Sequence, residues 1–491
     1  MSSAISRISD EALITVDHLV DRASDLFRPT MRFGVTGLSR AGKTVFITAL
    51  VHNLLHGGRL PLFKAQHSGR IASAYLEPQP DDGVPRFQYE DHVAALVDER
   101  LWPQSTRAIS ELRLTIEYES ASAWNRLLSP GKLSIDIVDY PGEWLLDLPL
   151  LNQDFRTFSR NAVEMARSPA RSDLSKQWLE MSLAGDVAAP ADESRARDLS
   201  ALFSDYLKTC RSDERALSTL PPGRFLMPGD LEGSPALTFA PLADLPAEGS
   251  APANSLWAMM ERRYEAYKSL VVKPFFRDHF ARLDRQVILI DAMQAMNAGP
   301  DAVQDLERAL VDILSCFRPG RANLLSSLVS RRIDRVLIAA TKADHLHHES
   351  HDRLEAIVRR LVDRATRRAG YARAEIEVLA MAAVRATKEA SVKRGREQLP
   401  LIVGTPMKGE KIDGETFDGK SKTGIFPGDL PADIDAFFEQ LNAADPAHHP
   451  HLNFVRFRPP RLERTAEGMT LSLPHIRLDR AFEFLFGDWL A

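Results

Sequence analysis

Residues 37–44, GLSRAGKT, follow the pattern G-x-x-x-x-G-K-[ST], which is typical of loops that bind nucleotide phosphates. Gly37 and Gly42 let the backbone curl so that successive N–H groups point at phosphate oxygens. Lys43 then reaches the β- and γ-phosphates, and the Thr44 hydroxyl is a direct Mg²⁺ ligand. The pattern predicts a site for a nucleoside triphosphate with Mg²⁺, whose backbone contacts come from Ser39, Arg40, Ala41, Gly42, Lys43, Thr44 and Val45.

A second motif, Asp139-Tyr140-Pro141-Gly142-Glu143, comes directly after the apolar run Leu133–Val138. Asp139 at a strand end can hold Mg²⁺ through a water molecule, and the Gly142 amide can sense the γ-phosphate. Ras-like GTPases place a glutamine after this glycine to position the attacking water, whereas this chain has Glu143. A carboxylate can orient water but adds negative charge beside a triphosphate, so we expect slow hydrolysis. The alternative for Asp139 is an ordinary acid in a turn.

The loop 102–107, WPQSTR, lies between these two motifs. A Ras-like switch I places a threonine ligand of Mg²⁺ here, and Thr106 fits better than Ser105 because it is closer to the next strand. Arg107 is a candidate for an arginine supplied in cis that neutralises charge in the transition state. The equal alternative is that Arg107 pairs with Glu111 on the surface.

A fourth motif, Thr341-Lys342-Ala343-Asp344, matches the [NT]-K-x-D pattern of guanine recognition. Asp344 can accept hydrogen bonds from the guanine N1–H and exocyclic amine, donors that adenine lacks, while Lys342 would lie along the purine ring. A backbone N–H near the guanine O6 is expected after the next strand, at Ala382, Ala383 or Val384. The order of the four motifs favours GTP over ATP.

A histidine-rich run directly follows this motif and comprises His345, His347, His348 and His351. Such a run can bind a metal ion. No acidic or cysteine residue is fixed beside it in the sequence. A solvated start of a helix is therefore the favoured interpretation.

Apolar strands alternate with helical patterns on either side of a long helical block. Strands are expected at Met31–Thr36, Glu111–Tyr118, Leu133–Val138, Gln286–Asp291, Arg335–Ala340 and Glu375–Ala380. Helices are expected at Thr44–Leu55, 90–100, 255–282, 301–316 and 350–368. This alternation predicts an α/β fold with a mostly parallel sheet, a P-loop NTPase core of the Ras-like kind.

The same reading divides the chain into five parts. They are an N-terminal helix (1–29), the first part of the core with an irregular insertion at 57–104 and switch I (30–144), an inserted helical domain with a proline-rich loop at 218–254 (145–283), the second part of the core (284–405), and a C-terminal extension (406–491). In the extension we expect an exposed loop at 405–430, strands at Asn453–Arg458 and 469–473, and a helix at 479–490.

Charge and composition limit the kinds of molecule that this chain is expected to bind. The net charge is −5 and the Arg-Arg pairs are scattered, so nucleic acid is not expected as a partner. No stretch of eighteen uncharged apolar residues occurs, which predicts a cytoplasmic protein, peripheral to a membrane at most. The two cysteines, Cys210 and Cys316, lack the spacing of a zinc site.

Taken together, these segments resemble the YcjX-like family of bacterial P-loop proteins. The resemblance rests on GLSRAGKT, the W-P-x-S-T block, DYPGEW, Gly223–Leu242, TKAD and Pro474–Arg480. It extends over nearly the whole chain. It implies a Ras-like GTPase core with a helical insertion and a stress-linked bacterial role, and in some members an inner-membrane protein partner.

The motifs favour a GTPase that binds GTP and GDP with Mg²⁺ and acts as a slow switch toward an unidentified protein partner. An ATPase or kinase is the alternative if the TKAD match is accidental. A second alternative is a scaffold stabilised by nucleotide that hardly hydrolyses it, which Glu143 keeps open.

Overall fold

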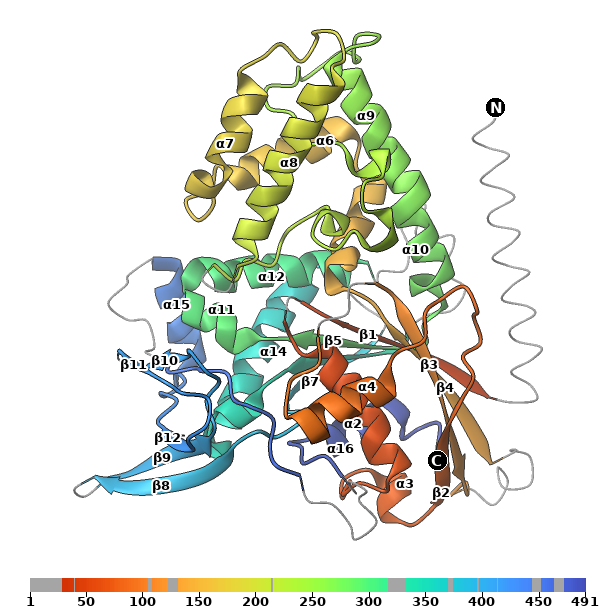
Figure 1. Ribbon diagram of the computed structural model, residues 1–491, viewed down its shortest axis with the longest axis vertical. Coiled ribbons are helices and arrows are strands. Elements are labelled where there is room, and N and C mark those ends of the chain that lie inside the picture. The colour runs from red at the N-terminus through yellow and green to blue at the C-terminus, as the bar shows by residue number, and fades with distance from the viewer. Residues whose placement is uncertain are drawn as a thin grey trace.

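The computed structural model describes residues 29–38, 40–104, 108–121, 131–212, 215–316, 333–369, 374–394, 397–412, 414–443, 452–462 and 472–491. A seven-stranded sheet in the order β2-β3-β4-β1-β5-β6-β7 forms its centre (Figure 1). The strands are β1 (Thr30–Gly37), β2 (Ile71–Glu77), β3 (Ser110–Tyr118), β4 (Lys132–Asp139), β5 (Arg285–Ile290), β6 (Arg335–Ala340) and β7 (Glu375–Ala380). The run from β4 to β7 in this order is parallel, while β3 is antiparallel to both β4 and β2. The expected α/β fold with a mostly parallel sheet is confirmed.

Helices connect these strands in chain order. Between β1 and β3 lie α2 (Lys43–Leu55), α3 (Lys64–His67), α4 (Tyr89–Ala94) and η1 (Ala95–Glu99). Between β4 and β5 lie the 3-10 helix η2 (Gly142–Asn152), α6 (Phe155–Ala166), α7 (Ser172–Leu183), α8 (Glu193–Cys210), α9 (Leu256–Tyr267), η6 (Lys268–Val272), α10 (Lys273–Asp278) and η7 (Phe280–Arg282). The later helices are α11 (Ala292–Ala298), α12 (Pro300–Ser315), α14 (His351–Ala369), α15 (Ile434–Ala443) and α16 (Leu478–Phe486).

Alternate side chains of each parallel strand serve two cores, one on each face of the sheet. On β5, Val287 and Leu289 join one apolar cluster, whereas Ile288 and Ile290 join the other. The helices α2 and α16 cover the first face, where the rings of Phe33 and Phe486 meet edge to face at 5.3 Å. The second face is covered by α12 and α14. Burial on both faces explains why these strands are near-continuous apolar runs.

We call residues 155–282, from α6 to η7, the helical block. In Figure 1 the helices α6, α7, α8 and α9 stand at one end of the molecule, beyond the sheet. Side chains of the block belong to the same apolar cluster as α12 and α14, including Trp178, Phe203 and Tyr264. The block therefore shares the core of the second sheet face, and its independence as a domain (145–283) stays a prediction.

Within the block, the proline-rich loop 218–254 contains only the 3-10 turns η3 (Gly223–Phe225), η4 (Gly229–Leu231) and η5 (Pro235–Leu237). The helix expected at 255–282 runs without a gap from Leu256 to Asp278, because α9, the π-helix η6 and α10 follow one another directly, and the 3-10 helix η7 comes just after it. Pro274 lies at the start of α10 and has no N–H to donate to the preceding turn. A π-helical turn just before Pro274 accommodates the missing donor, and the helix continues into α10.

Two segments expected to be irregular contain strands. The 57–104 insertion includes β2, a half-exposed edge strand whose sequence IASAYLE lacks clear apolar alternation. The 405–430 loop contributes β10 (Lys411–Ile412), β11 (Glu415–Thr416) and β12 (Thr423–Ile425). Of these, β12 pairs with β9 (Glu397–Gly404), which in turn pairs with β8 (Lys388–Arg394).

The strand predicted at Asn453–Arg458 is wrong, since only an isolated bridge joins Phe457 to Pro406. Pro406 has no N–H and prolines 459 and 460 follow, so the ladder cannot extend. In place of the strand near 469–473, the Leu473 N–H donates to the Asn53 side chain at 3.0 Å. Residues 469–471 and the predicted N-terminal helix up to residue 28 lie outside the described residues.

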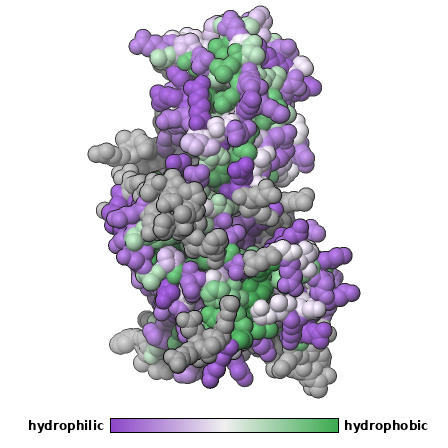
Figure 2. Space-filling model, turned by 90° about the vertical axis from the view of Figure 1, so that its left-hand side faces the viewer, coloured by the Kyte–Doolittle hydropathy of each residue, from purple (hydrophilic) through white to green (hydrophobic). Residues whose placement is uncertain are grey.

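Hydrophilic side chains predominate on the face seen in Figure 2, with separate hydrophobic areas between them. Among the described residues, no helix combines the length and the apolar character needed to cross a bilayer.

Candidate functional site

The GLSRAGKT segment joins the end of β1 to the start of α2, as the motif requires. Gly42 precedes α2 in the left-handed conformation, with a φ of 85°, and Arg40 also has a positive φ of 59°. The Leu38 N–H donates to the Leu289 carbonyl of β5 at 3.1 Å, which fixes the start of the loop on the sheet. The first amides of α2 therefore point out of the sheet edge as an anion-binding helix start. Ser39 lies outside the described residues.

Thr44, the predicted Mg²⁺ ligand, is buried at the base of this loop. Its hydroxyl donates to the Gln104 carbonyl at 3.4 Å, a long hydrogen bond. Gln104 directly precedes the predicted switch I residues. Ser105, Thr106 and Arg107 themselves lie outside the described residues, so their roles stay predictions.

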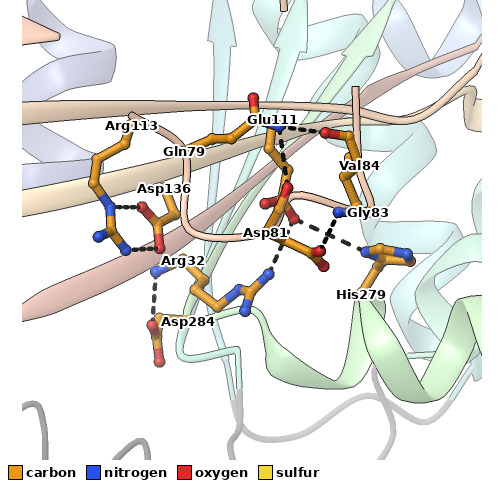
Figure 3. A network of polar contacts seen from close by, with 10 residues as sticks. All are labelled: Arg32, Gln79, Asp81, Gly83, Val84, Glu111, Arg113, Asp136, His279 and Asp284. Carbon is orange, nitrogen blue, oxygen red and sulfur yellow. Dashed lines mark hydrogen bonds and ion pairs between the residues drawn. The ribbon is translucent and has the colours of Figure 1, made fainter. Parts of the chain in front are cut away.

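The alternative interpretation of Arg107 placed Glu111 on the surface, and this location of Glu111 is wrong. This carboxyl is fully buried and lies 3.1 Å from the Arg32 guanidinium of β1, as Figure 3 shows. His279, at the end of α10, approaches the same carboxyl at 4.0 Å. Burial raises the pKa of Glu111 and lowers that of His279 to about 4. The first residues of β3, just after the predicted switch I, therefore contact β1 and the helical block.

Asp139 is the last residue of β4 and is buried between β1 and β3, with Val35 and Ser110 as its backbone neighbours. The loop that follows runs directly against residues 37–44, the predicted phosphate-binding loop, which we call the P-loop. A Cβ atom on Gly142 would lie 2.3 Å from the Gly37 carbonyl oxygen, so only glycine permits this approach. The structure thereby brings Gly142 beside the P-loop, as the γ-phosphate prediction requires.

Glu143 continues from this contact into the helical block. Its carboxylate lies 3.1 Å from the guanidinium of Arg211, and only 5% of the Glu143 side chain is exposed. On the backbone side, a Cβ atom on Gly223 would come 2.0 Å from the Glu143 carbonyl oxygen. Arg211 is 68 residues from Glu143 in the sequence, and no local pattern pointed to it.

The rest of η2 is fastened to the same block. Asp147 accepts hydrogen bonds from the Gly223 N–H at 2.7 Å and from the Tyr267 hydroxyl at 2.6 Å. The guanidinium of Arg224 stacks on the Trp144 ring, 3.2 Å from its centre. Burial raises the pKa of Asp147 to about 6, although its two hydrogen bonds act in the opposite direction.

The TKAD residues follow β6 at the same sheet edge. Asp344 is buried, and one of its carboxylate oxygens accepts the Ala386 N–H at 2.8 Å. The amine of Lys342 lies 2.5 Å from the Asp291 carboxylate instead of standing free for a purine ring. The sequence analysis did not identify Asp291 as a site residue, although an acidic residue at the end of a predicted strand would have been a reason to do so.

Of the three residues expected near the guanine O6, the Ala382 N–H donates to the Ile476 carbonyl at 3.1 Å. That bond leaves Ala383 and Val384 as the better candidates for the contact to the guanine O6.

In the histidine run, His351 starts α14 as expected, but it is buried and contacts the Ala343 carbonyl at 2.8 Å. An acidic partner does lie beside the run, because Glu389 of β8 contacts His348 at 2.7 Å.

Comparison with known proteins identifies relatives over the full length. Residues 31–490 match the model of the YcjX-like family (DUF463). A protein of Escherichia coli K12 named Ras-like GTPase YcjX is 37% identical over 99% of this chain and 100% of its own length. A protein of the same name from Shewanella oneidensis is 32% identical over 94% of both chains.

The raised pKa of Asp147 predicts how the stability of the protein depends on pH. The folded protein keeps the Asp147 proton up to about pH 6, whereas the carboxyl normally loses it near 3.8. Its contribution to the free energy of unfolding is therefore highest at low pH and falls by up to about 3 kcal/mol as pH rises through this window. Relative to the parent, Asp147→Asn should gain stability from pH 4 to pH 7 in chemical denaturation.

Asp154→Asn is the matched control for this measurement. Asp154 caps α6, and its hydrogen bond to the Thr157 N–H lowers its pKa. Its stabilisation is present at neutral pH and lost on acidification, so this variant should drift in the opposite direction. A constant difference between Asp147→Asn and the parent across the pH range would contradict the prediction.

Proposed function

This chain belongs to the YcjX-like family, and from that premise we propose that it binds GTP and GDP with Mg²⁺ and hydrolyses GTP slowly. The observation that carries the proposal is the meeting of three motifs at one edge of the sheet. The P-loop follows β1, Asp139 ends β4 and the TKAD segment with Asp344 follows β6. These strands run parallel, so all three motifs lie at carboxyl ends of strands. This is the edge at which open α/β sheets bind nucleotides.

The residues support distinct roles in this proposal. Lys43 and the α2 amides bind the phosphates, and the Gly142 amide responds to the γ-phosphate. The donor set of Thr44, Asp139 and Thr106 is made of oxygen atoms, which Mg²⁺ prefers, and the ion would neutralise charge on the β- and γ-phosphates. Glu143 would orient the attacking water once its carboxylate is released from Arg211.

A scaffold that binds nucleotide with little turnover is the second candidate. The Glu143–Arg211 ion pair favours it, because the guanidinium lies 3.1 Å from one of the two carboxylate oxygens and competes with water for that oxygen. The stress-linked role, and a protein partner at the inner membrane, enter the proposal from the family resemblance alone. An ATPase or kinase remains the alternative outcome of the test of base preference.

Base preference is tested with Asp344→Asn. The Ala386 N–H donates to one Asp344 oxygen, so the asparagine carbonyl should take that position and turn its NH₂ toward the base. Guanine offers donors there, whereas xanthine offers a carbonyl at position 2. We expect the variant to lose GTP affinity by about 100-fold and to gain XTP affinity, since a charge-assisted pair of hydrogen bonds is exchanged.

Affinities for GTP, XTP and ATP are measured on the parent, on Asp344→Asn, and on Glu349→Gln. Glu349 lies in the same loop with an exposed side chain, and its neutralisation should change nothing. Parental GTP affinity in Asp344→Asn, or a parent that prefers ATP, would sink the guanine assignment and favour the ATPase alternative.

A further inference from the structure

Arg211 stands where the helical block meets the nucleotide-binding edge. It directly follows α8 as its C-cap, and its N–H donates to the Leu207 carbonyl at 3.1 Å. Its guanidinium reaches the Glu143 carboxylate at 3.1 Å, and 21% of the side chain is exposed. The pair therefore lies at the position where Ras-like GTPases have their water-positioning glutamine.

Arg211 also lies within reach of the P-loop. Together with Leu38, which directly follows Gly37, it lines a small pocket that also borders Ile290 and Asp291 at the end of β5. Burial lowers the pKa of Arg40 in the P-loop, and the charges of Arg211 and Arg456 lower it further. This mutual effect indicates that Arg211 adds positive potential at the place where the phosphates would lie.

The segment after Arg211 is anchored on α12, which limits how far the arginine can move. The amides of Ser218 and Thr219 both donate to the Asp305 carboxylate, at 2.6 and 2.8 Å. Asp305 also forms a buried ion pair with Arg171 at 2.7 Å. A side chain on such a fixed segment can change its partner without moving the backbone that carries it.

We propose that Arg211 is a cis-supplied arginine that leaves Glu143 and contacts the γ-phosphate oxygens when GTP is hydrolysed. The inference rests on the GTPase function proposed above and identifies a catalytic residue for that same site. In hydrolysis, the oxygen of water bonds to the γ-phosphorus and the bond from that phosphorus to the bridging oxygen breaks. GDP leaves with the bonding electron pair, while phosphate keeps one proton of the water and the other passes to solvent.

The ion pair explains why Arg211 stays on Glu143 without a γ-phosphate and why it leaves Glu143 when a γ-phosphate is bound. Without a γ-phosphate, Glu143 and Arg211 neutralise each other in a nearly buried position, which avoids an unpaired buried charge. A γ-phosphate offers more negative charge than one carboxylate and suits the planar guanidinium, which can donate two parallel hydrogen bonds. The exchange frees Glu143 to orient water in the same step.

The test compares Arg211→Ala and Arg211→Lys with the matched control Arg215→Ala. Arg215 is an exposed arginine on the same segment. Two ligands are titrated into the full-length protein with Mg²⁺: a non-hydrolysable GTP analogue, and GDP with aluminium fluoride, which mimics the transferring phosphoryl group. Single-turnover GTP hydrolysis is measured on the same samples.

We expect Arg211→Ala to lose about 10³-fold in hydrolysis rate and in affinity for GDP with aluminium fluoride, with less than about a tenfold change for the GTP analogue. Arg211→Lys should lie between Ala and the parent, and Arg215→Ala should match the parent. Parental affinity of Arg211→Ala for the fluoride complex would overturn the inference. So would an equal loss of affinity for both ligands, because that would show a ground-state role.

If Arg211→Ala does not fold, the ratio of the two affinities in Arg211→Lys decides by the same criterion. A parent that binds no GTP analogue would overturn the proposed function itself. If the parent binds the analogue but Arg211→Ala changes the affinities for both ligands equally, only the role of Arg211 is overturned.

An independent observation concerns the histidine run. The ligand atoms of His347, His348 and Glu389 all lie within 4.8 Å of one another. The carboxylate oxygen of Glu389 is 2.7 Å from His348 Nδ1 and 3.9 Å from His347 Nε2. Its other oxygen is held by the Arg385 guanidinium at 3.1 Å, which orients the carboxylate.

We infer that these three residues bind a divalent transition-metal ion, with Zn²⁺ as the probe, in a site completed by water. Two imidazoles and one carboxylate are a common protein set for such ions. His347 and His348 follow the TKAD segment, while Glu389 is on β8, just after the loop whose Ala386 bonds to Asp344. A bound ion would therefore join the two loops that form the guanine site.

Zn²⁺ binding is measured by calorimetry on the parent, His348→Ala, Glu389→Gln and the control His67→Ala, an exposed histidine of α3. We expect one site in the parent, a loss of about 100-fold in affinity in the first two variants, and parental binding in the control. A parent without this site, or an equal affinity in His348→Ala and His67→Ala, would overturn the inference.

Discussion

The first two residues of η2 are enclosed between two other stretches of backbone. On one side the Gly142 α-carbon leaves no room for a side chain against the Gly37 carbonyl of the P-loop. On the other side Gly223 of the helical block is equally close to the Glu143 carbonyl. Because protein interiors are closely packed, a shift of one layer must displace the next. The P-loop, η2 and the helical block are therefore mechanically linked at this point.

The apolar core strengthens this link. The rings of Tyr140 and Trp144 both pack edge to face on Phe275 of α10, at 5.4 and 5.5 Å. Both belong to the cluster that runs from the sheet into the helical block. Asp147 adds the buried hydrogen bonds to Gly223 and Tyr267, which are costly to leave unmade. A nucleotide-dependent movement at Gly142 would thus reach the block through bonded and packed contacts, in the manner of a γ-phosphate switch.

The parts of this arrangement that are local in sequence were predictable. The P-loop, Asp139-to-Gly142 and TKAD motifs all lie at strand ends, and the alternation of apolar strands and helices indicated the parallel sheet. The pairing of Glu143 with Arg211 was not predictable, because it depends on the packing of a block between β4 and β5. The edge strand β2 was missed since its side chains are half exposed, and Phe457 forms only one bridge because prolines surround it. Contacts between segments far apart in the sequence cannot be predicted from short sequence patterns.

Hydrogen–deuterium exchange of the full-length protein tests the link between nucleotide and helical block most directly. The protein is compared with GDP and with a non-hydrolysable GTP analogue, both with Mg²⁺. We expect the two states to differ in amide protection at 142–152 and also at 215–225 in the helical block, since the backbones of Glu143 and Gly223 are in contact. Differences confined to the P-loop and residues 142–144, with unchanged exchange throughout the helical block, would contradict the coupling.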